Sequence, residues 1–175
     1  CLARARQNSL QTFAGGSVEA VMESMRTNPG DVSVQRLGCL NLALNGERGA
    51  NIHASGGVKL VKDAMQEYLA DAAVQNHGCR ALAALATFDQ PNIIAAGGAE
   101  LAIQAMHKHP GDVQIQSHAC HALAFLARDE LSLARIADAG GVVWTIEAMH
   151  KHPRHVGVQV HGCRVLCVLA NIIHN

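Results

Sequence analysis

The sequence predicts an all-α solenoid of tandem repeats, because three kinds of residue recur along its 175 positions with one period. Glycine pairs begin at Gly15, Gly56, Gly97 and Gly140. Methionines follow them at Met25, Met65, Met106 and Met149. Cysteines follow in turn at Cys39, Cys79, Cys120 and Cys163. Each series advances by 40 to 43 residues, so we expect four stacked units of about 42 residues instead of one globular core.

Each unit is expected to contain three helices. A short first helix ends at the glycine pair, as in residues 92–98, because glycine enters the left-handed region beyond a helix end without a Cβ clash. An amphipathic second helix follows, for example Val142 to His150, with Val143, Ile146 and Met149 on one apolar face. In three of the units a break with proline, at Pro29, Pro110 and Pro153, then separates the second helix from the third.

An N-cap residue precedes the third helix in most units. Asp31, Asp71 and Asp112 each stand three residues before the next apolar anchor, where a carboxylate accepts hydrogen bonds from the first backbone N–H groups. His155 takes this position in the fourth unit and is expected to cap less well.

The third helix carries the most specific motif, a β-branched residue and Gln followed by a small residue and Cys. Its copies are Val34–Cys39, Val74–Cys79, Ile115–Cys120 and Val158–Cys163, completed by Leu42, Leu82, Leu123 and Leu166. The Gly or Ala before each Cys lets neighbouring helices approach closely. A wider residue there is expected to cost about 1–3 kcal/mol of stability.

This pattern resembles the armadillo repeat, with three helices per unit, a period near 42, a glycine pair and a VQxxGCxxL third helix. The resemblance covers essentially the whole chain, from a first helix within Leu2–Phe13 to a last third helix near Val158–Ile172. It implies a right-handed armadillo-type α-solenoid, one array over residues 1–175 with repeats at about 1–46, 47–87, 88–128 and 129–175. Because the chain starts at Cys1 inside a first helix, we expect a fragment of a longer protein.

In armadillo proteins the third helices line a concave groove that binds extended protein segments, without catalysis. At about 100° per residue, one solvent-facing stripe runs along these helices. Its candidate partner-binding residues are His77, Arg80, His118, His121, Phe125, His161 and Arg164. The first unit presents Leu37, Leu40 and Leu44 in the same stripe, an apolar row typical of a contact surface.

The groove is expected to bind a protein or peptide, specifically an acidic or phosphorylated segment. Peptide-binding family members carry tryptophans where this chain has Leu40, Arg80, His121 and Arg164. They carry asparagines where it has Leu44, Ala84, Phe125 and Val168. The asparagine ladder that holds a ligand backbone is therefore missing, and the Arg and His side chains disfavour a basic peptide. We expect Phe125 to anchor the segment, Arg80 and Arg164 to guide it, and binding to be tighter at pH 6 than at pH 8.

The Arg and His stripe can also be an ordinary solvated helix face without a function. Two alternative roles for the chain remain open as well. The segment is a structural spacer or self-assembly unit of a longer solenoid, associating end to end through repeats that lack a polar cap. Alternatively, the histidine-rich strings bind a transition metal through His107 with His109 and His150 with His152. Metal ligands usually come in threes or fours, so we expect no metal site and no cofactor.

Composition excludes several other functions. Lys+Arg 14 balance Asp+Glu 14, which removes the charge that drives nucleic-acid binding, and no apolar run is long enough to insert in a membrane. No Walker loop, GxGxxG, HExxH or GxSxG motif is present, so we expect no enzyme. The repeated cysteines are expected in the core as reduced thiols, which favours a cytoplasmic or nuclear location.

Overall fold

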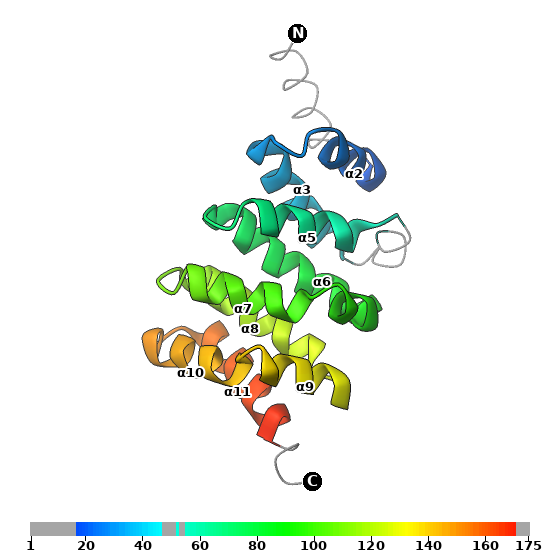
Figure 1. Cartoon of the computed structure of the whole chain (residues 1–175). Coiled ribbons are helices and arrows are strands. Elements are labelled where there is room, and N and C mark those ends of the chain that lie inside the picture. Colours follow the sequence, from blue (N-terminus) through cyan, green and yellow to red (C-terminus); the bar gives the residue numbers. More distant parts are fainter. Residues whose placement is uncertain (1–16, 47–51, 53–54, 171–175) are drawn as a thin grey trace.

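The computed structural model describes residues 17–46, 52 and 55–170, and the elements within them are all helices (Figure 1). They are α2 (Val18–Thr27), α3 (Val32–Leu44), α5 (Gly57–Glu67), α6 (Ala72–Ala95), α7 (Gly98–Lys108), α8 (Val113–Leu126), α9 (Glu130–Asp138), α10 (Gly141–Lys151) and α11 (Val156–Ala170). The first helix expected within Leu2–Phe13 and the glycine pair at Gly15 lie outside the described residues.

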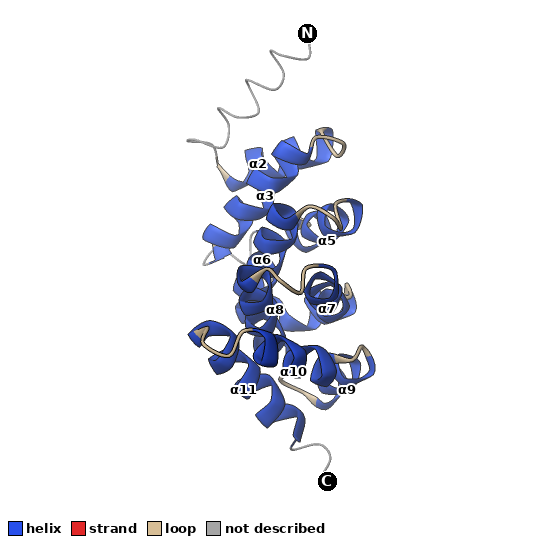
Figure 2. Ribbon diagram, turned by 90° about the vertical axis from the view of Figure 1, so that its left-hand side faces the viewer, coloured by secondary structure: helices blue, strands red, loops and turns tan. Residues whose placement is uncertain are grey.

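The helices form two layers along the stack (Figure 2). The third helices α3, the first part of α6, α8 and α11 lie side by side in chain order. The second helices α2, α5, α7 and α10 form the other layer, each packed against the third helix that follows it. The described chain is therefore an all-helical, α-solenoid-like stack.

Helix α6 runs through two of the expected units. Its backbone is interrupted at Asp89 (φ −145°, ψ 50°), and Pro91 follows within the first turn of the next stretch. Residues 90–95 therefore take the place of a short first helix before α7. In the last unit the same role is filled by a separate helix, α9, which precedes α10 and α11. The expected division between residues 87 and 88 falls beside this kink.

Both residues of the three described glycine pairs are required by the backbone. The first glycine is left-handed, with φ of 81°, 86° and 85° at Gly56, Gly97 and Gly140. The second glycine is in close contact with the helix before it. A Cβ on Gly98 would lie 2.9 Å from the carbonyl oxygen of Ile93 and 2.3 Å from its side chain. A side chain at either position would therefore strain the turn that reverses the chain.

The predicted N-caps are confirmed. Asp71 Oδ1 accepts from the N–H of Val74 at 2.9 Å, and Asp31 and Asp112 cap α3 and α8 in the same way. His155 also caps its helix, since its Nδ1 accepts from the N–H of Val158 at 3.3 Å. The length of that bond does not separate His155 from the aspartates, since the equivalent bonds of Asp71, Asp112 and Asp31 are 2.9 Å, 3.1 Å and 3.4 Å long.

The glutamine of the third-helix motif makes the same pair of hydrogen bonds in every described unit. Gln75 Nε2 donates to the carbonyl oxygens of Met65 (2.7 Å) and Tyr68 (3.0 Å), at the end of α5. Gln35, Gln116 and Gln159 make the same pair of bonds in the other units. The side chain thereby satisfies two carbonyls that the end of the second helix leaves without a helical partner.

Methionine fills the space beside the small residue of the motif. A Cβ on Gly78 would lie 2.5 Å from both Cγ and Sδ of Met65, and Gly38 and Gly162 face Met25 and Met149 in the same way. The third unit has Ala119 at this position, with both Ala119 and Met106 fully buried. The contact is therefore tight, but a methyl group is accommodated there when the methionine adapts.

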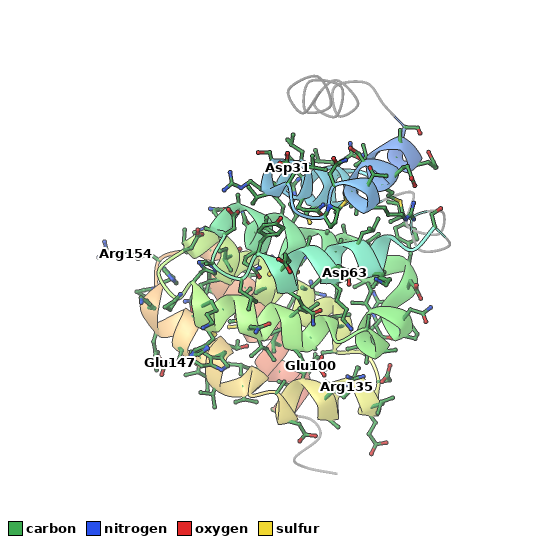
Figure 3. The ribbon with its side chains drawn as sticks, turned by 45° about the horizontal axis from the view of Figure 1, so that its top comes forward. Asp31, Asp63, Glu100, Arg135, Glu147 and Arg154 are labelled. Atoms are coloured by element: carbon green, nitrogen blue, oxygen red, sulfur yellow. The ribbon has the colours of Figure 1, made fainter. Side chains whose placement is uncertain are left out.

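Adjacent units are joined by hydrogen bonds between their loops. Tyr68 Oη donates to the carbonyl oxygen of Pro29 at 2.8 Å. The Nε2 atoms of His109 and His152 lie 2.8 Å and 3.1 Å from the carbonyl oxygens of Leu69 and Pro110. Arg135 Nη2 of α9 also donates to Glu100 Oε1 of α7 at 2.8 Å, and both residues are labelled in Figure 3.

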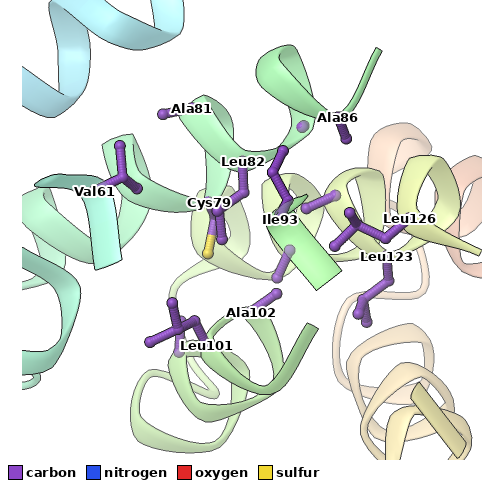
Figure 4. Close-up of a cluster of buried hydrophobic side chains, with 14 of the residues drawn as sticks. Val61, Cys79, Ala81, Leu82, Ala86, Ile93, Leu101, Ala102, Leu123 and Leu126 are labelled. Atoms are coloured by element: carbon purple, nitrogen blue, oxygen red, sulfur yellow. The ribbon is translucent and has the colours of Figure 1, made fainter. Parts of the chain in front are cut away.

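The core runs between the two layers, with Cys79, Leu82 and Leu123 among its buried residues (Figure 4). The prediction that the repeated cysteines are all buried is correct for Cys39, Cys79 and Cys120 and wrong for Cys163, which is exposed. The earlier cysteines are covered by the next third helix, whereas no described helix follows α11. Val143 and Ile146 of the expected apolar face are exposed at the same end, because Thr145 and Ala148 are the buried side chains of α10.

Replacing Gln75 with Ala is expected to lower the free energy of unfolding by about 2–4 kcal/mol, because two carbonyl groups lose their donor in a buried setting. Urea unfolding followed by circular dichroism measures this change. Gln159→Ala is the matched control. Gln159 is half-buried and its second bond is 3.3 Å long, so water can replace it and the loss should be smaller. Equal losses in the two variants would contradict this role of the buried glutamine.

Candidate functional site

The seven candidate residues lie on three adjacent third helices. His77 and Arg80 are on α6, His118, His121 and Phe125 are on α8, and His161 and Arg164 are on α11. We call these seven residues the third-helix face. The expectation of an exposed stripe is wrong for most of them, since only Arg164 is exposed and the other six are half-buried. Neighbouring third helices lie close enough to cover part of each side chain.

Four residues of the third-helix face form a cluster between α8 and α11. The rings of His121 and His161 are stacked, with centroids 4.2 Å apart and an angle of 23°. His121 also meets the edge of Phe125 at 4.9 Å, and the Arg164 guanidinium lies 5.4 Å from the centre of the Phe125 ring. The aromatic anchor expected at Phe125 is therefore packed among cationic and imidazole groups.

Two residues beside the third-helix face were not predicted. The guanidinium of Arg128 lies 5.9 Å from the centre of the Phe125 ring. Arg128 comes after Phe125 in the chain, whereas His121 comes before it. The Nδ1 atom of His118 lies 2.7 Å from Asn76 Oδ1, which fixes the ring against the preceding unit. Arg128 lies beyond the end of α8 at Leu126, so helical spacing from Phe125 gave no signal for it. Asn76 carried no signal either.

His77 and Arg80 lie apart from this cluster. Within the described residues they share no ring contact or hydrogen bond with it, and their link to α8 is electrostatic. The positive charge of Arg80 and the neighbouring imidazole of His77 contribute to lowering the pKa of His118. The residues of α6 therefore interact electrostatically with those of α8, while the aromatic contacts of the third-helix face are between α8 and α11.

Burial is the largest cause of lowered pKa at all four histidines of the third-helix face, and nearby cations add to it. The pKa of His121 falls to about 4 through burial, the neighbouring His161 and His118, and Arg164. The pKa of His77, His118 and His161 is also lowered, in each case by burial and then by an arginine. These rings are therefore mainly neutral at pH 7 and carry little charge in the free protein.

Acidic side chains counteract the lowering of the histidine pKa only weakly. Asp71 raises the pKa of His77 and Asp112 raises that of His118, but each is the smallest cause in its case. Asp71 also accepts from Arg36 Nε at 3.0 Å and from the N–H of Val74, and Asp112 caps α8. Both carboxylates therefore already have partners on the protein itself.

The apolar stripe of the first unit is partly confirmed. Leu44 is exposed, whereas Leu37 and Leu40 are half-buried on α3. Ala84 and Val168, at the positions equivalent to Leu44 and Phe125, are also half-buried. The row that begins at Leu44 therefore continues as small or apolar side chains along the third helices.

The histidine-rich strings are used for packing. The ring of His107 contacts that of Trp144, with centroids 4.6 Å apart, while His109 and His152 are bonded to the loops of preceding units. Within residues 17–46, 52 and 55–170 there is no group of three or more His, Cys, Asp or Glu residues placed to hold a metal ion. None of the helices described is long and apolar enough to cross a membrane.

Lowering the pH from 7 to 5 is expected to destabilise the fold through His121. Its pKa is about 4 in the folded chain and 6.5 when unperturbed, so between these values the unfolded chain binds more protons. Its contribution is fully present above pH 6.5 and is lost as the pH falls toward 4. Urea midpoints at pH 7 and pH 5 should therefore differ less in His121→Gln than in the wild type. His150→Gln, at an exposed position on α10, should behave like the wild type, and an unchanged difference in His121→Gln would refute the assignment.

Comparison with known proteins gives one structural likeness. No protein-family model matches the chain, and no curated protein matches it. The chain is similar to a crystal structure of an engineered protein from the Northeast Structural Genomics Consortium, with a TM-score of 0.74 and 25% sequence identity over 87% of this chain. It spans 62% of the length of that protein. The likeness agrees with an all-helical, α-solenoid-like fold.

Proposed function

We propose that this protein is a non-catalytic protein-interaction scaffold that binds an acidic or phosphorylated segment along its third-helix face. The observation that carries the proposal is the cluster in which Arg164 and Arg128 flank Phe125 beside the stacked rings of His121 and His161. Cationic groups, neutral imidazoles and an aromatic ring together offer both charge and apolar contact to an extended anionic chain.

We also propose that the stack is a right-handed armadillo-type solenoid with three helices per repeat and a concave third-helix groove. Its support is the sequence resemblance together with the order of α9, α10 and α11 and the left-handed glycine before α5, α7 and α10. In such a solenoid an extended segment would cross successive third helices, which places α6, α8 and α11 along its path.

Binding in this proposal involves charge pairing and proton uptake. Arg80 and Arg164 pair with carboxylates or phosphates of the segment, and Phe125 contacts an apolar part of it. The bound anion raises the pKa of the nearby histidines, so protons are taken up and affinity increases as the pH falls. In the free protein those pKa values lie below 6.5. The increase in affinity therefore continues below pH 6 and is not complete between pH 8 and pH 6.

The absence of catalysis is part of the proposal, and the buried thiols support it. Burial raises the pKa of Cys39 and of Cys120 to about 12 and also raises that of Cys79. These cysteines stay protonated near neutral pH and are poor nucleophiles. A reducing compartment, the cytoplasm or nucleus, suits such thiols.

A fluorescein-labelled decamer of glutamate is expected to bind the wild type, and Arg80→Ala/Arg164→Ala is expected to weaken that binding by about tenfold, since each solvent-accessible charge pair contributes about 0.5–1 kcal/mol. Fluorescence anisotropy measures the change. The matched control is Lys108→Ala/Lys151→Ala, which removes the same charge from exposed positions on α7 and α10. Equal weakening in both variants would mean that only net charge matters, and the proposed surface would be rejected.

End-to-end self-association is a second candidate role, and the exposed apolar side chains of α11 favour it. Val156 and Val160 are 73% and 51% exposed. The residue equivalent to Val160 in the earlier units contacts the following unit: Arg36 pairs with Asp71, Asn76 with His118, and a Cβ on Gly157 would meet Ser117. The described surface of α11 thus matches the surface that earlier third helices use for stacking.

Analytical ultracentrifugation tests this second role. The wild type is expected to associate with increasing concentration, and Val156→Asp/Val160→Asp to stay monomeric because charges replace the apolar contact. Leu131→Asp changes a side chain of similar exposure on α9 and should still associate. A wild type that remains monomeric at its highest soluble concentration would exclude self-association through α11.

A further inference from the structure

A small apolar pocket lies between α3 and α6, outside the seven residues of the third-helix face. Its volume is about 320 Å³, and its lining residues are Ala43, Leu44, Gly46, Ala84, Thr87 and Phe88. None of these side chains is charged. Leu44 and Phe88 are 59% and 54% exposed, so two large apolar side chains meet solvent at the same pocket. The only side-chain hydroxyl, on Thr87, donates to the carbonyl oxygen of Ala84 at 2.8 Å and is not offered to a ligand.

The pocket continues the line of the third-helix face along α6. Ala84 follows Arg80 by four residues and Phe88 follows it by eight, so they lie one and two helical turns further along the same side. Leu44 reaches the pocket from α3, the neighbouring third helix. A chain that pairs with Arg80 can therefore place its next residues over the pocket.

We infer that this pocket receives one bulky apolar side chain of the same acidic segment that binds the third-helix face. The inference rests on the proposed function and adds a requirement on the ligand, which must carry an apolar residue beside its acidic residues. Two features select this occupant. The cations of the third-helix face select an anionic chain, and the uncharged lining disfavours a carboxylate at the pocket itself. The volume suits a single leucine, phenylalanine or tryptophan side chain and is too small for a packed helix.

The experiment uses fluorescein-labelled acidic decamers and the full chain. The reference is the decamer of glutamate, and ten further peptides each replace one glutamate by leucine, so that every register is sampled. At least one leucine peptide is expected to bind the wild type about tenfold more tightly than the reference, because it buries the leucine together with Leu44 and Phe88. In Leu44→Ser/Phe88→Ser this gain should disappear while binding of the reference peptide stays the same. Both substitutions are at exposed positions, so the fold is expected to tolerate them.

Leu131→Ser is the matched control, since it removes an exposed leucine from α9 and should keep the tenfold gain. The inference is overturned if no leucine peptide binds more tightly than the reference, or if the gain survives in Leu44→Ser/Phe88→Ser. It is also overturned if the double substitution changes the oligomeric state, which would show that a second copy covers the pocket.

Failure of the proposed function gives different results. If no acidic decamer binds the wild type, the function and the inference fall together. A serine decamer with one leucine separates the two ideas. If it binds as tightly as the acidic leucine peptide and loses affinity in Leu44→Ser/Phe88→Ser, the pocket is confirmed as an apolar site and the acidic ligand is rejected.

Discussion

The hydrogen bonds of one glutamine per unit hold the two helical layers together. A second helix that ends in the interior leaves carbonyl groups without partners, and an unsatisfied buried carbonyl costs about 1–3 kcal/mol. Gln35, Gln75 and Gln116 are almost fully buried, and each reaches back ten and seven residues to two such carbonyls. This bond sets the distance between the second and third helices, and the methionine packed at Gly38 or Gly78 depends on that distance. With the helix pair fixed, units can stack in register, and side chains at equivalent positions meet across unit boundaries.

The register between neighbouring third helices brings side chains of different units together on the third-helix face. His121 and His161 occupy different positions of the motif, one after and one before the cysteine, and they stack because α8 and α11 lie side by side at a fixed offset. The pair Arg36–Asp71 joins α3 to the start of α6 in a similar way, and the pair His118–Asn76 joins α6 to α8. Proximity then lowers the pKa of the histidines, because each ring is half covered and faces other cationic groups. The chemistry of the third-helix face is thus a property of the stack and belongs to no single helix.

The features that the sequence predicted well are those that repeat and act locally. The described glycine pairs and the Asp N-caps each depend on one turn, and the burial of Cys39, Cys79 and Cys120 recurs with the period of the sequence. The exposure of Cys163 depends instead on which helix packs over it, and that of Val143 and Ile146 on Thr145 and Ala148 being the buried side chains of α10. The role of the motif glutamine was missed because its partners are backbone atoms, which leave no trace in residue identity. The loop histidines His109 and His152 suggested metal binding for the same reason, since their carbonyl partners lie in the preceding unit.

The most direct test of the proposed site is an NMR titration of the histidine ring signals with and without the glutamate decamer. In the free protein, His77, His118, His121 and His161 are expected to titrate below 6.5, with His121 lowest at about 4. With the peptide bound, the pKa of these four histidines should rise, while the ring signals of the exposed His150 on α10 should not respond to the peptide. Peptide binding that leaves the four pKa values unchanged would contradict the account, because the acidic segment would then lie away from the third-helix face.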